Sequence, residues 1–384
     1  MVRLGDVCTF YSGTGFPNIY QGKADGKYPF YKVGDISRNV LSGNRELKIC
    51  ENYIDDDTVT KIKGTLLPPQ TVVFAKIGEA LRLNRRAITS RDCLVDNNAM
   101  GIKSDDSIID SLYFYYFMCN VDLQNYCEST TVPSVRKTRI AEIEIPLPPL
   151  DEQRRIAAVL DKVSDLIAKR REQLDKLDEL VKARFVEMFG DINLNDKGWN
   201  AQPLGALCTI VRGASPRPIE QYLGGDIPWI KIGDATDDEN IYLYSTKEHI
   251  IQAGVKKSRL VKAGSLIFAN CGVSLGFARI ITFDGCIHDG WLAMEDIDIR
   301  LDKVFLLQAL NQMTDHFRKI APSGTQPNLN TAIMKSYMQI IPPMKLQKGF
   351  VSFVDQIDKS KLTIQRSLDK LEVLKKALMQ QYFG

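Results

Sequence analysis

Long hydrophobic runs, paired cysteines and histidines are scarce in this sequence. No apolar stretch approaches the roughly 20 residues that a helix needs to cross a bilayer, and residues 1–6 contain no apolar signal-peptide core. None of the eight cysteines forms a C-x-x-C pair, and only three histidines are present, so the close ligand pairs of a zinc site are missing. We therefore expect a cytosolic protein with no metal or other cofactor.

Sequence signatures of several enzyme classes are also absent. There is no G-x-x-x-x-G-K-[ST] phosphate loop, no G-x-G-x-x-G after a predicted strand and no G-x-S-x-G nucleophile elbow. No Asn or Asp precedes a Pro-Pro-aromatic group, the arrangement with which adenine methyltransferases hold a flipped base. The acidic runs Asp55–Asp57 and Asp237–Glu239 are typical of charged loop tips rather than metal sites. We expect a protein that is not an enzyme.

The sequence does contain an internal duplication, the typical signature of repeated architecture. The recurring blocks are Leu4–Thr9 and Leu204–Thr209, Pro29–Asp35 and Pro228–Asp234, Val73–Gly78 and Ile267–Gly272, Thr131–Arg136 and Thr325–Asn330, Pro148–Pro149 and Pro342–Pro343, Leu174–Leu177 and Leu368–Leu371, and Phe189–Gly190 and Phe383–Gly384. Their separation drifts from 200 residues (Leu4 to Leu204) to 194 (Leu174 to Leu368). Blocks that recur in one order with a slowly changing offset indicate two copies of one unit.

Each copy is predicted to hold a globular region of mixed α/β structure followed by a long helix. Short β-branched and aromatic runs predict strands at Thr71–Ile77 and Ser265–Ala269. Helices are predicted at Ile108–Asn125 and Asp302–Ile320, and Gly-, Ser- and Pro-rich loops at Ser12–Pro17 and Gly213–Pro218. The predicted boundaries are 1–149 and 191–343 for the globular domains, and 150–190 and 344–384 for the helices.

The two long helices are indicated by heptad spacing. Between Asp151 and Gly190 there is neither Gly nor Pro, and apolar residues recur at alternating steps of four and three. The first seam contains Ile156, Leu160, Val163, Ile167, Leu174, Leu177, Val181 and Met188, and the second contains Phe350, Val354, Ile357, Ile364, Leu368, Leu371, Leu378 and Tyr382. A stripe this narrow favours helix pairing, although packing of each helix on its own globular domain stays open.

The remaining signals are basic residues on predicted loops. Fifty basic against 47 acidic residues give a net charge of only +3, so a nucleic-acid surface would have to be a local patch. Basic clusters occur at Lys76, Arg82, Arg85, Arg86 and Arg91 in the first copy, and at Arg212, Arg217, Lys256, Lys257, Arg259 and Lys262 in the second. Such clusters can neutralise DNA phosphates.

A family resemblance makes the DNA hypothesis specific. The run Pro146–Ile156, which opens the first long helix and continues to Phe189–Gly190, resembles the central conserved region of HsdS, the specificity subunits of Type I restriction-modification systems. The two Lys-x-Gly-Asp blocks and the run Thr325–Leu329 are similar to that family's target-recognition domains. The resemblance covers the whole chain, but the second helix begins Met344-Lys345-Leu346-Gln347 instead of Leu150-Asp151-Glu152-Gln153.

The resemblance implies two similar target-recognition domains separated by two long antiparallel coiled-coil helices. Each domain would bind one half of a bipartite site in double-stranded DNA, and the helices would set the gap between the halves. Two adenine methyltransferase subunits, which use S-adenosylmethionine, and ATP-dependent restriction subunits would be the partners. Alternatives are a specificity subunit of a methylation-only system, an enzyme with an unrecognised site, and a coiled-coil adaptor that binds no DNA.

The candidate DNA-binding residues lie on both copies. They are Ser12, Thr14, Lys32, Lys76, Arg82, Arg85, Arg86, Arg136 and Lys137 in the first, and Arg212, Ser215, Arg217, Lys231, Asn270, Ser274, Thr325, Gln326 and Asn328 in the second. Matched positions differ, as with Lys76 and Asn270, so the half-sites are predicted to differ. Arg85 and Arg86 are predicted to contact phosphates rather than bases.

Polar interruptions in the seams predict how the helices pair. An antiparallel register that sets Arg170 opposite Lys375 and Arg184 opposite Lys361 also sets Leu174 opposite Leu371. Polar seam residues commonly specify register, so this arrangement is the predicted one. It would invert one recognition domain relative to the other.

Overall fold

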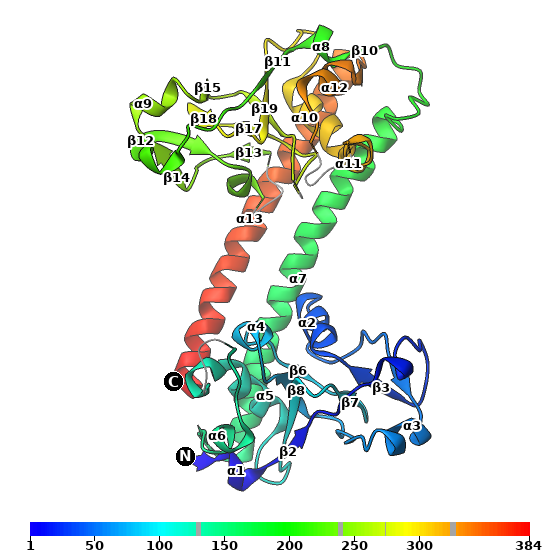
Figure 1. Ribbon diagram of the computed structural model, residues 1–384, viewed down its shortest axis with the longest axis vertical. Coiled ribbons are helices and arrows are strands. Elements are labelled where there is room, and N and C mark those ends of the chain that lie inside the picture. The colour runs from blue at the N-terminus through cyan, green and yellow to red at the C-terminus, as the bar shows by residue number, and fades with distance from the viewer. Residues whose placement is uncertain (128–131, 237–240, 273, 323–327) are drawn as a thin grey trace. The chain divides into compact units, whose positions relative to one another are not determined.

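The fold is described from a computed structural model, which describes residues 1–127, 132–236, 241–272, 274–322 and 328–384 (Figure 1). The chain divides into two compact units. Unit 1 comprises Met1–Arg171 and Arg366–Gly384, and unit 2 comprises Glu172–Gln365. Each long helix therefore contributes one half to each unit. Among the described residues, no helix combines the length and the apolar character of a membrane span.

Unit 1 contains a four-stranded sheet of order β2-β8-β5-β6, a three-stranded sheet of order β4-β3-β7 and the pair β1-β9. Its strands are β1 (Val2–Arg3), β2 (Cys8–Ser12), β3 (Tyr28–Tyr31), β4 (Tyr53–Ile54), β5 (Val72–Ala75), β6 (Ala87–Ile88), β7 (Leu94–Val95), β8 (Ala99–Ser104) and β9 (Glu144–Ile145). Its shorter helices are α1 (Leu4–Val7), η1 (Asn18–Tyr20), α2 (Val33–Leu41), α3 (Asp56–Lys61), α4 (Glu79–Arg82), α5 (Ser111–Asn120), η2 (Leu123–Tyr126) and α6 (Lys137–Ala141).

Unit 2 contains a five-stranded sheet of order β11-β19-β16-β17-β13, a four-stranded sheet of order β14-β12-β18-β15 and the pair β10-β20. Its strands are β10 (Ala201–Pro203), β11 (Thr209–Arg212), β12 (Leu223–Ile230), β13 (Tyr242–Leu243), β14 (Glu248–Ile250), β15 (Arg259–Val261), β16 (Leu266–Ala269), β17 (Ala278–Ile281), β18 (Gly285–Ile287), β19 (Trp291–Glu295) and β20 (Met338–Ile340). Its shorter helices are α8 (Leu204–Leu207), η3 (Ile219–Gln221), η4 (Ile232–Ala235), α9 (Gln252–Val255), α10 (Lys303–Gln312), α11 (Thr314–Ile320) and α12 (Thr331–Ser336).

The two units repeat one strand plan, which confirms the predicted duplication and the mixed α/β class. The order β2-β8-β5-β6 in unit 1 corresponds to β11-β19-β16-β17 in unit 2. The parallel pairs correspond as well, because Phe30 and Tyr31 pair with β7 as Trp229 and Ile230 pair with β18. Unit 2 adds β13 at the edge of its larger sheet.

The expected strands are present as β5 and β16, but the expected helices are shorter than predicted. The helix expected over Ile108–Asn125 is α5, which ends at Asn120 and is followed by the 3₁₀ turn η2. Asp110 begins α5 by accepting the backbone N–H groups of Leu112 and Tyr113. In unit 2 the predicted single helix is divided into α10 and α11, and Met313 lies between them.

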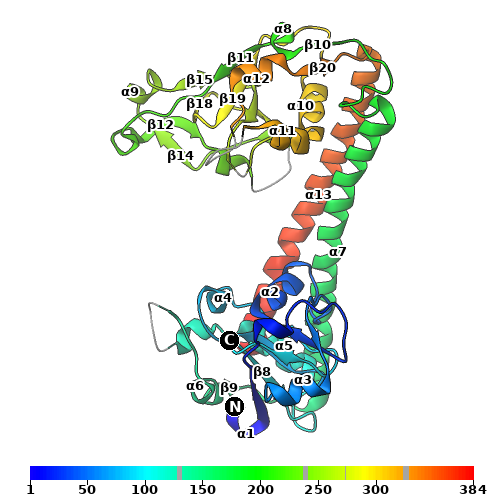
Figure 2. The same cartoon turned by 45° about the vertical axis from the view of Figure 1, so that its right-hand side comes forward.

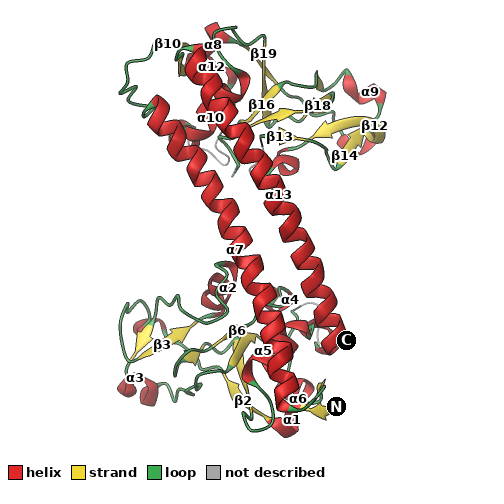
Figure 3. Cartoon of the chain, turned by 180° about the vertical axis from the view of Figure 1, so that it is seen from behind, coloured by secondary structure: helices red, strands yellow, loops and turns green. Residues whose placement is uncertain are grey.

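The two long helices are α7 (Leu150–Phe189) and α13 (Met344–Phe383), and each is one continuous helix (Figure 3). Within each unit the α7 half and the α13 half lie side by side and run antiparallel (Figure 1, Figure 2). All predicted seam residues of both helices are buried or half-buried. The heptad spacing therefore identified the correct face of each helix.

The ends of these helices are core elements of the globular units. The core of unit 1 includes Ile156 and Leu160 from α7 and Phe383 from α13, whose ring centroid lies 5.1 Å from that of Tyr113. The core of unit 2 includes Phe185, Phe189 and Phe350, with ring centroids of Phe185 and Phe350 5.3 Å apart. Burial of such rings provides much of the apolar area of a core. The helices are therefore more than a coiled-coil seam, and the open alternative of packing on a globular domain is partly correct.

The predicted helix register is wrong. Inside unit 2, Lys361 Nζ lies 2.6 Å from Asp178 Oδ1, nearly two turns before Arg184 on α7. Arg184 instead lies with its guanidinium 5.9 Å from the ring centroid of Phe353 and pairs with Glu187. The prediction set two basic residues against each other, whereas the structure sets a basic residue against a carboxylate, which removes the charge repulsion.

A buried glutamine attaches the start of each long helix to its unit. Gln153 accepts the backbone N–H of Asp110 at 2.9 Å and donates to the carbonyl oxygens of Ile108 and Pro148. In unit 2, Gln347 makes the equivalent set of bonds to Asp302, Arg300 and Pro342. The glutamine is thus the shared anchor of the two helix starts, although the residues before it differ.

Candidate nucleic-acid interface

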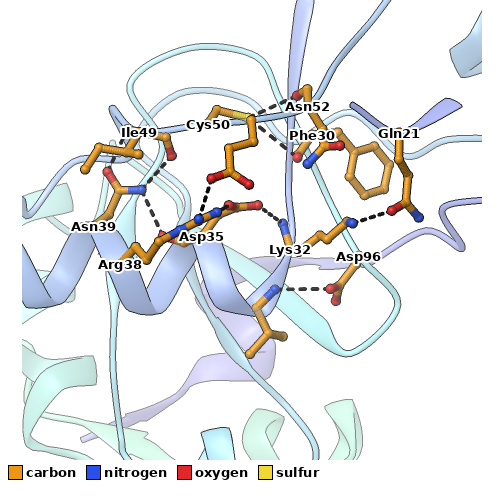
Figure 4. Close-up of polar contacts among 12 residues, drawn as sticks. Gln21, Phe30, Lys32, Asp35, Arg38, Asn39, Ile49, Cys50, Asn52 and Asp96 are labelled. Carbon is orange, nitrogen blue, oxygen red and sulfur yellow. Dashed lines mark hydrogen bonds and ion pairs between the residues drawn. The ribbon is translucent and has the colours of Figure 1, made fainter. Parts of the chain in front are cut away.

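The Lys-x-Gly-Asp block of unit 1 folds into a turn that begins α2 (Figure 4). The backbone N–H of Lys32 donates to Asp35 Oδ2 at 2.7 Å, and Asp35 forms an ion pair with Arg38. The ammonium group of Lys32 donates to Gln21 and lies 5.8 Å from the ring centroid of Phe16. Asp35 is therefore a structural residue of the turn, and Lys32 is held in place by an uncharged partner.

Unit 2 repeats this turn with a charged partner. The backbone N–H of Lys231 donates to Asp234 Oδ2 at 2.8 Å, and the hydroxyl of Thr246 donates to the same oxygen at 2.7 Å. The ammonium group of Lys231 donates to Glu248 and lies 5.5 Å from the ring centroid of Trp229. The two copies thus share a scaffold but differ in charge beside the lysine.

Glycine at Gly13 and Gly213 lets each candidate loop approach a strand end closely. A side chain at Gly13 would overlap with the carbonyl oxygen of Asp96, and one at Gly213 with that of His288. The next residue is bonded to the strand in both units, because Thr14 N donates to Val95 O and Ala214 N donates to Ile287 O. Both predicted loops therefore lie beside the residue that follows the parallel strand, and Asp96 corresponds to His288.

The loop of unit 2 carries two exposed arginines around one carboxylate. Arg212 Nε donates to the backbone oxygen of Asp289 at 3.1 Å, and Arg217 Nη2 lies 3.7 Å from Asp289 Oδ2. The hydroxyl of Ser215 donates to Asp289 Oδ1 at 2.9 Å. The structure thus brings together three predicted candidates, although sequence analysis did not identify the aspartate between them.

His288 is held in its neutral form next to this loop. Its Nδ1 accepts the backbone N–H of Gly290 at 3.0 Å, so the ring proton lies on Nε2, which faces Asp289 Oδ1 at 2.9 Å. Burial lowers the pKa of His288, Asp289 opposes that shift, and the charges of Lys231, Arg217 and Arg212 add to it. The positive charge beside this loop therefore comes from Arg212, Arg217 and Lys231 rather than from His288.

Two other candidate segments meet in each unit. In unit 1 an isolated bridge joins Ile77 to Ser134, and Val135 N donates to Lys76 O. In unit 2 the corresponding bridge joins Cys271 to Asn328. The duplicated blocks around Lys76 and Arg136 are thus neighbours in space, as are those around Asn270 and Asn328. No group of three or more metal-ligating side chains occurs among the residues that the structure describes.

Comparison with known proteins settles the family. The model of the Type I restriction modification DNA specificity domain matches residues 1–178 and 196–375. The chain belongs to this Type I specificity family. Similar curated proteins include two Type I restriction enzyme specificity subunits of Methanocaldococcus jannaschii. The MjaIX subunit is 24% identical over 359 residues, covering 86% of this chain and 80% of that protein. The MjaVIII subunit is 22% identical over 414 residues, covering 99% and 90%.

Solved structures of Type I systems share the fold. The S subunit of the Type I restriction-modification system of M. genitalium matches with a TM-score of 0.57 and 15% identity, covering 100% of this chain and 95% of that one. A chain from a structure that describes assembly and conformational transition of a type I R-M system matches with a TM-score of 0.58 and 19% identity, covering 100% and 96%. At such low identities these likenesses concern the fold of the specificity chain alone.

Two candidates of this specificity chain are too buried to contact DNA as folded. Arg86 is 2% exposed and donates to the Asn84 side chain at 2.6 Å and to the Arg85 and Val121 carbonyl oxygens. Its guanidinium lies 4.9 Å from the ring centroid of Phe74. Asn270 is fully buried and donates to Asn328 and to the Leu329 carbonyl. Paired basic residues in a sequence do not reveal that one of them faces inward.

The other candidates have mixed positions in the specificity chain. Thr14 is buried and accepts the backbone N–H of Thr65 at 3.0 Å, which makes it structural. The exposed candidates are Ser12, Arg82, Arg136, Lys137, Arg212 and Arg217, and the half-buried ones are Lys32, Lys76, Arg85, Ser215, Lys231, Ser274 and Asn328. Lys137 Nζ lies 5.4 Å from the Phe10 ring centroid, and Arg82 pairs with Glu79. Thr325 and Gln326 lie outside the described residues.

Sequence analysis missed the residues that hold the candidates in place. Gln21 accepts from Lys32, and Glu248 accepts from Lys231. His288 and Asp289 lie beside the loop that carries Arg212 and Arg217. None of the four lies in a recognised motif. The signal that could have identified His288 and Asp289 was their position along the chain, because Asp96 and His288 each directly follow a strand that pairs in parallel with another strand.

Proposed function

We propose that this chain is the DNA-recognition subunit of a Type I restriction-modification complex and has no catalytic centre of its own. The proposal rests on one observation above all: two copies of a single fold carry different polar groups beside matched residues. Gln21 and Glu248 differ in charge beside equivalent lysines, and Asp96 corresponds to His288. A duplicated scaffold with different polar groups suits recognition of two different DNA sequences.

We propose that residues 1–149 and 191–343 each bind one half of a bipartite, asymmetric target. Residues 150–190 and 344–384 would be the helical spacer between the halves. Exposed Arg212 and Arg217 suit guanine edges or phosphates, whereas unit 1 presents Ser12 in the place of Arg212. The different chemistry of the two surfaces supports unlike half-sites.

The partners proposed are two adenine methyltransferase subunits, which supply S-adenosylmethionine chemistry, and ATP-dependent restriction subunits. Support comes from the family and from relatives named as Type I restriction enzyme specificity subunits. The division of labour explains why the sequence carries neither a phosphate loop nor a methyltransferase motif. This chain alone is accordingly expected to transfer no methyl group and to hydrolyse no ATP.

A salt titration tests DNA binding by the chain in complex with its methyltransferase subunits. Binding of duplex DNA should weaken linearly on a log–log scale as salt rises, because phosphate contacts release counterions. The same methyltransferase without this chain is the control, and it should lose sequence preference. Equal affinity and sequence preference with and without the chain would contradict the proposal.

A further inference from the structure

Asp289 is the shared acceptor of the basic loop in unit 2. Its carboxylate accepts from the Ser215 hydroxyl at 2.9 Å, and it lies 2.9 Å from His288 Nε2 and 3.7 Å from the Arg217 guanidinium. Its backbone oxygen accepts from Arg212 at 3.1 Å. Asp289 therefore contacts Arg212 through its backbone oxygen and Arg217 and Ser215 through its carboxylate, while the arginine side chains themselves stay exposed.

The loop backbone is fixed independently of these side chains. Gly213 N donates to Trp291 O, Ala214 N donates to Ile287 O, and the Ser258 hydroxyl donates to Ala214 O at 2.7 Å. Loss of the Asp289 charge would consequently free the Arg217 side chain without releasing the loop, and Arg212 would keep its bond to the Asp289 backbone oxygen. The carboxylate is therefore not needed to form the turn, and its distinct effects are the pairing with Arg217 and the negative charge that it places beside both arginines.

Unit 1 has a neutral residue at this position. Asp96 N bonds to Tyr31 O as His288 N bonds to Ile230 O, and Lys76 N bonds to Asn98 O as Asn270 N bonds to Gly290 O. The residue between these two bonds is Asn97 in unit 1 and Asp289 in unit 2. Ser12 occupies the place of Arg212. The carboxylate thus occurs in the copy whose loop carries arginines.

We propose that Asp289 is a specificity-determining residue that suppresses binding of unit 2 to non-target DNA. This proposal rests on the proposed function and names one residue's contribution to it. Binding to non-target DNA depends mainly on phosphate neutralisation. A carboxylate beside Arg212 and Arg217 lowers the local positive potential, and its pairing with Arg217 opposes rotation of that side chain toward the phosphates of any duplex. In target DNA the same pairing holds Arg217 in position for its contact.

The test compares the methyltransferase complexes of the wild type and of Asp289→Asn. Each is titrated with a duplex that carries the sequence the wild-type complex methylates and with a scrambled duplex of equal length. The variant should bind scrambled DNA about 3- to 30-fold more tightly, with a salt slope steeper by about one unit. Target affinity should change less, so the ratio of target to scrambled affinity should fall. Asp289→Glu, which keeps the charge, should restore much of the ratio.

Asp284→Asn is the matched control, because Asp284 also pairs with a basic residue, Lys262, at 2.7 Å but precedes β18 rather than following it. It removes the same charge and should leave the ratio near that of the wild type. Equal scrambled-DNA affinity and salt slope in Asp289→Asn and wild type would overturn the inference, as would an equal fall of the ratio in Asp284→Asn. Absence of sequence preference in the wild-type complex would instead overturn the proposed function.

Discussion

Arg86 is a positive charge held inside unit 1 by uncharged acceptors. Burial lowers its pKa to about 10, and its Nε has no hydrogen-bond partner in the structure. Arg279 in unit 2 is buried as well, and its Nη1 donates to the preceding carbonyl at 2.9 Å, as Arg86 Nη1 does at 3.1 Å. Both guanidinium groups lie against a phenylalanine ring, at 4.9 and 4.8 Å from the centroid. Burial and the contact with the Phe74 ring indicate a packing role for Arg86.

Substitution separates Arg86 from its neighbour Arg85. Arg86→Met keeps the apolar stem and removes a desolvated charge, so the salt slope of DNA binding should be unchanged and stability should stay within about 1–2 kcal/mol of the wild type. Arg85→Ala should lower the salt slope by about one unit if Arg85 contacts a phosphate. Titrations at several salt concentrations measure both. A lower slope for Arg86→Met, in a protein with normal thermal stability, would mean that Arg86 reaches DNA.

Asp358 on α13 is the second residue whose environment has a measurable consequence. Burial raises its pKa to about 6, with Asp355 and Asp178 adding to the shift and Lys361 opposing it. Because this pKa is raised, the folded protein binds a proton at the Asp358 carboxyl group more tightly than the unfolded chain does. The burial cost is therefore present in full above pH 6 and diminishes as the pH falls from 6 toward the ordinary value of 3.8.

Asp358→Asn removes this cost. The variant should have a higher Tm than the wild type at pH 8, and most of the difference should disappear at pH 4. Asp165→Asn, at an exposed carboxylate on α7, provides the comparison and should give little change at either pH. A Tm gain for Asp358→Asn that is equally large at pH 4 and pH 8 would show that the carboxyl group titrates normally.

At the scale of elements, the start of each long helix depends on one amide side chain. Gln153 and Gln347 each satisfy one backbone donor and two backbone acceptors in the loops they contact. Both side chains are buried, so water cannot replace those bonds. The sequence difference between Asp151-Glu152 and Lys345-Leu346 therefore matters less than the glutamine that follows.

Gln347→Leu fills nearly the same volume but leaves three backbone groups without the bonds that the buried amide supplies. The free energy of unfolding of unit 2 should fall by about 2–5 kcal/mol. Chemical denaturation measures this change, and Lys345→Leu, at an exposed position in the same turn, should change stability by less than about 1 kcal/mol. If both variants unfold at the same denaturant concentration, the glutamine does not anchor the helix.

Only part of the packing of the long helices could be predicted from the sequence. Periodicity identified the seam because burial repeats at fixed steps along a helix. It missed Phe185 and Phe189, whose rings pack into the core of unit 2 outside the seam. The register failed because the polar seam residues were matched by type, whereas Lys361 pairs with Asp178, a residue beside the seam.

At the scale of the whole molecule, duplication made most of the fold predictable from sequence. Matched blocks identified the repeated unit, and the strand plans of the two units agree. Site residues were harder, because exposure depends on tertiary packing: Arg86 and Asn270 are buried, whereas Arg85 and Arg136 reach the surface to different degrees. Asp289 was missed because nothing in its local sequence distinguishes it from other loop carboxylates.

The most direct test of two unlike recognition domains is to sequence methylated adenines in cells that carry this chain and its methyltransferase. The expected result is one bipartite motif with two different halves and a fixed gap, which disappears when the chain is omitted. An exchange of residues 191–343 for the equivalent domain of a relative should change one half and retain the other. A palindromic motif, an unbroken motif, or the same motif without this chain would contradict the central claim.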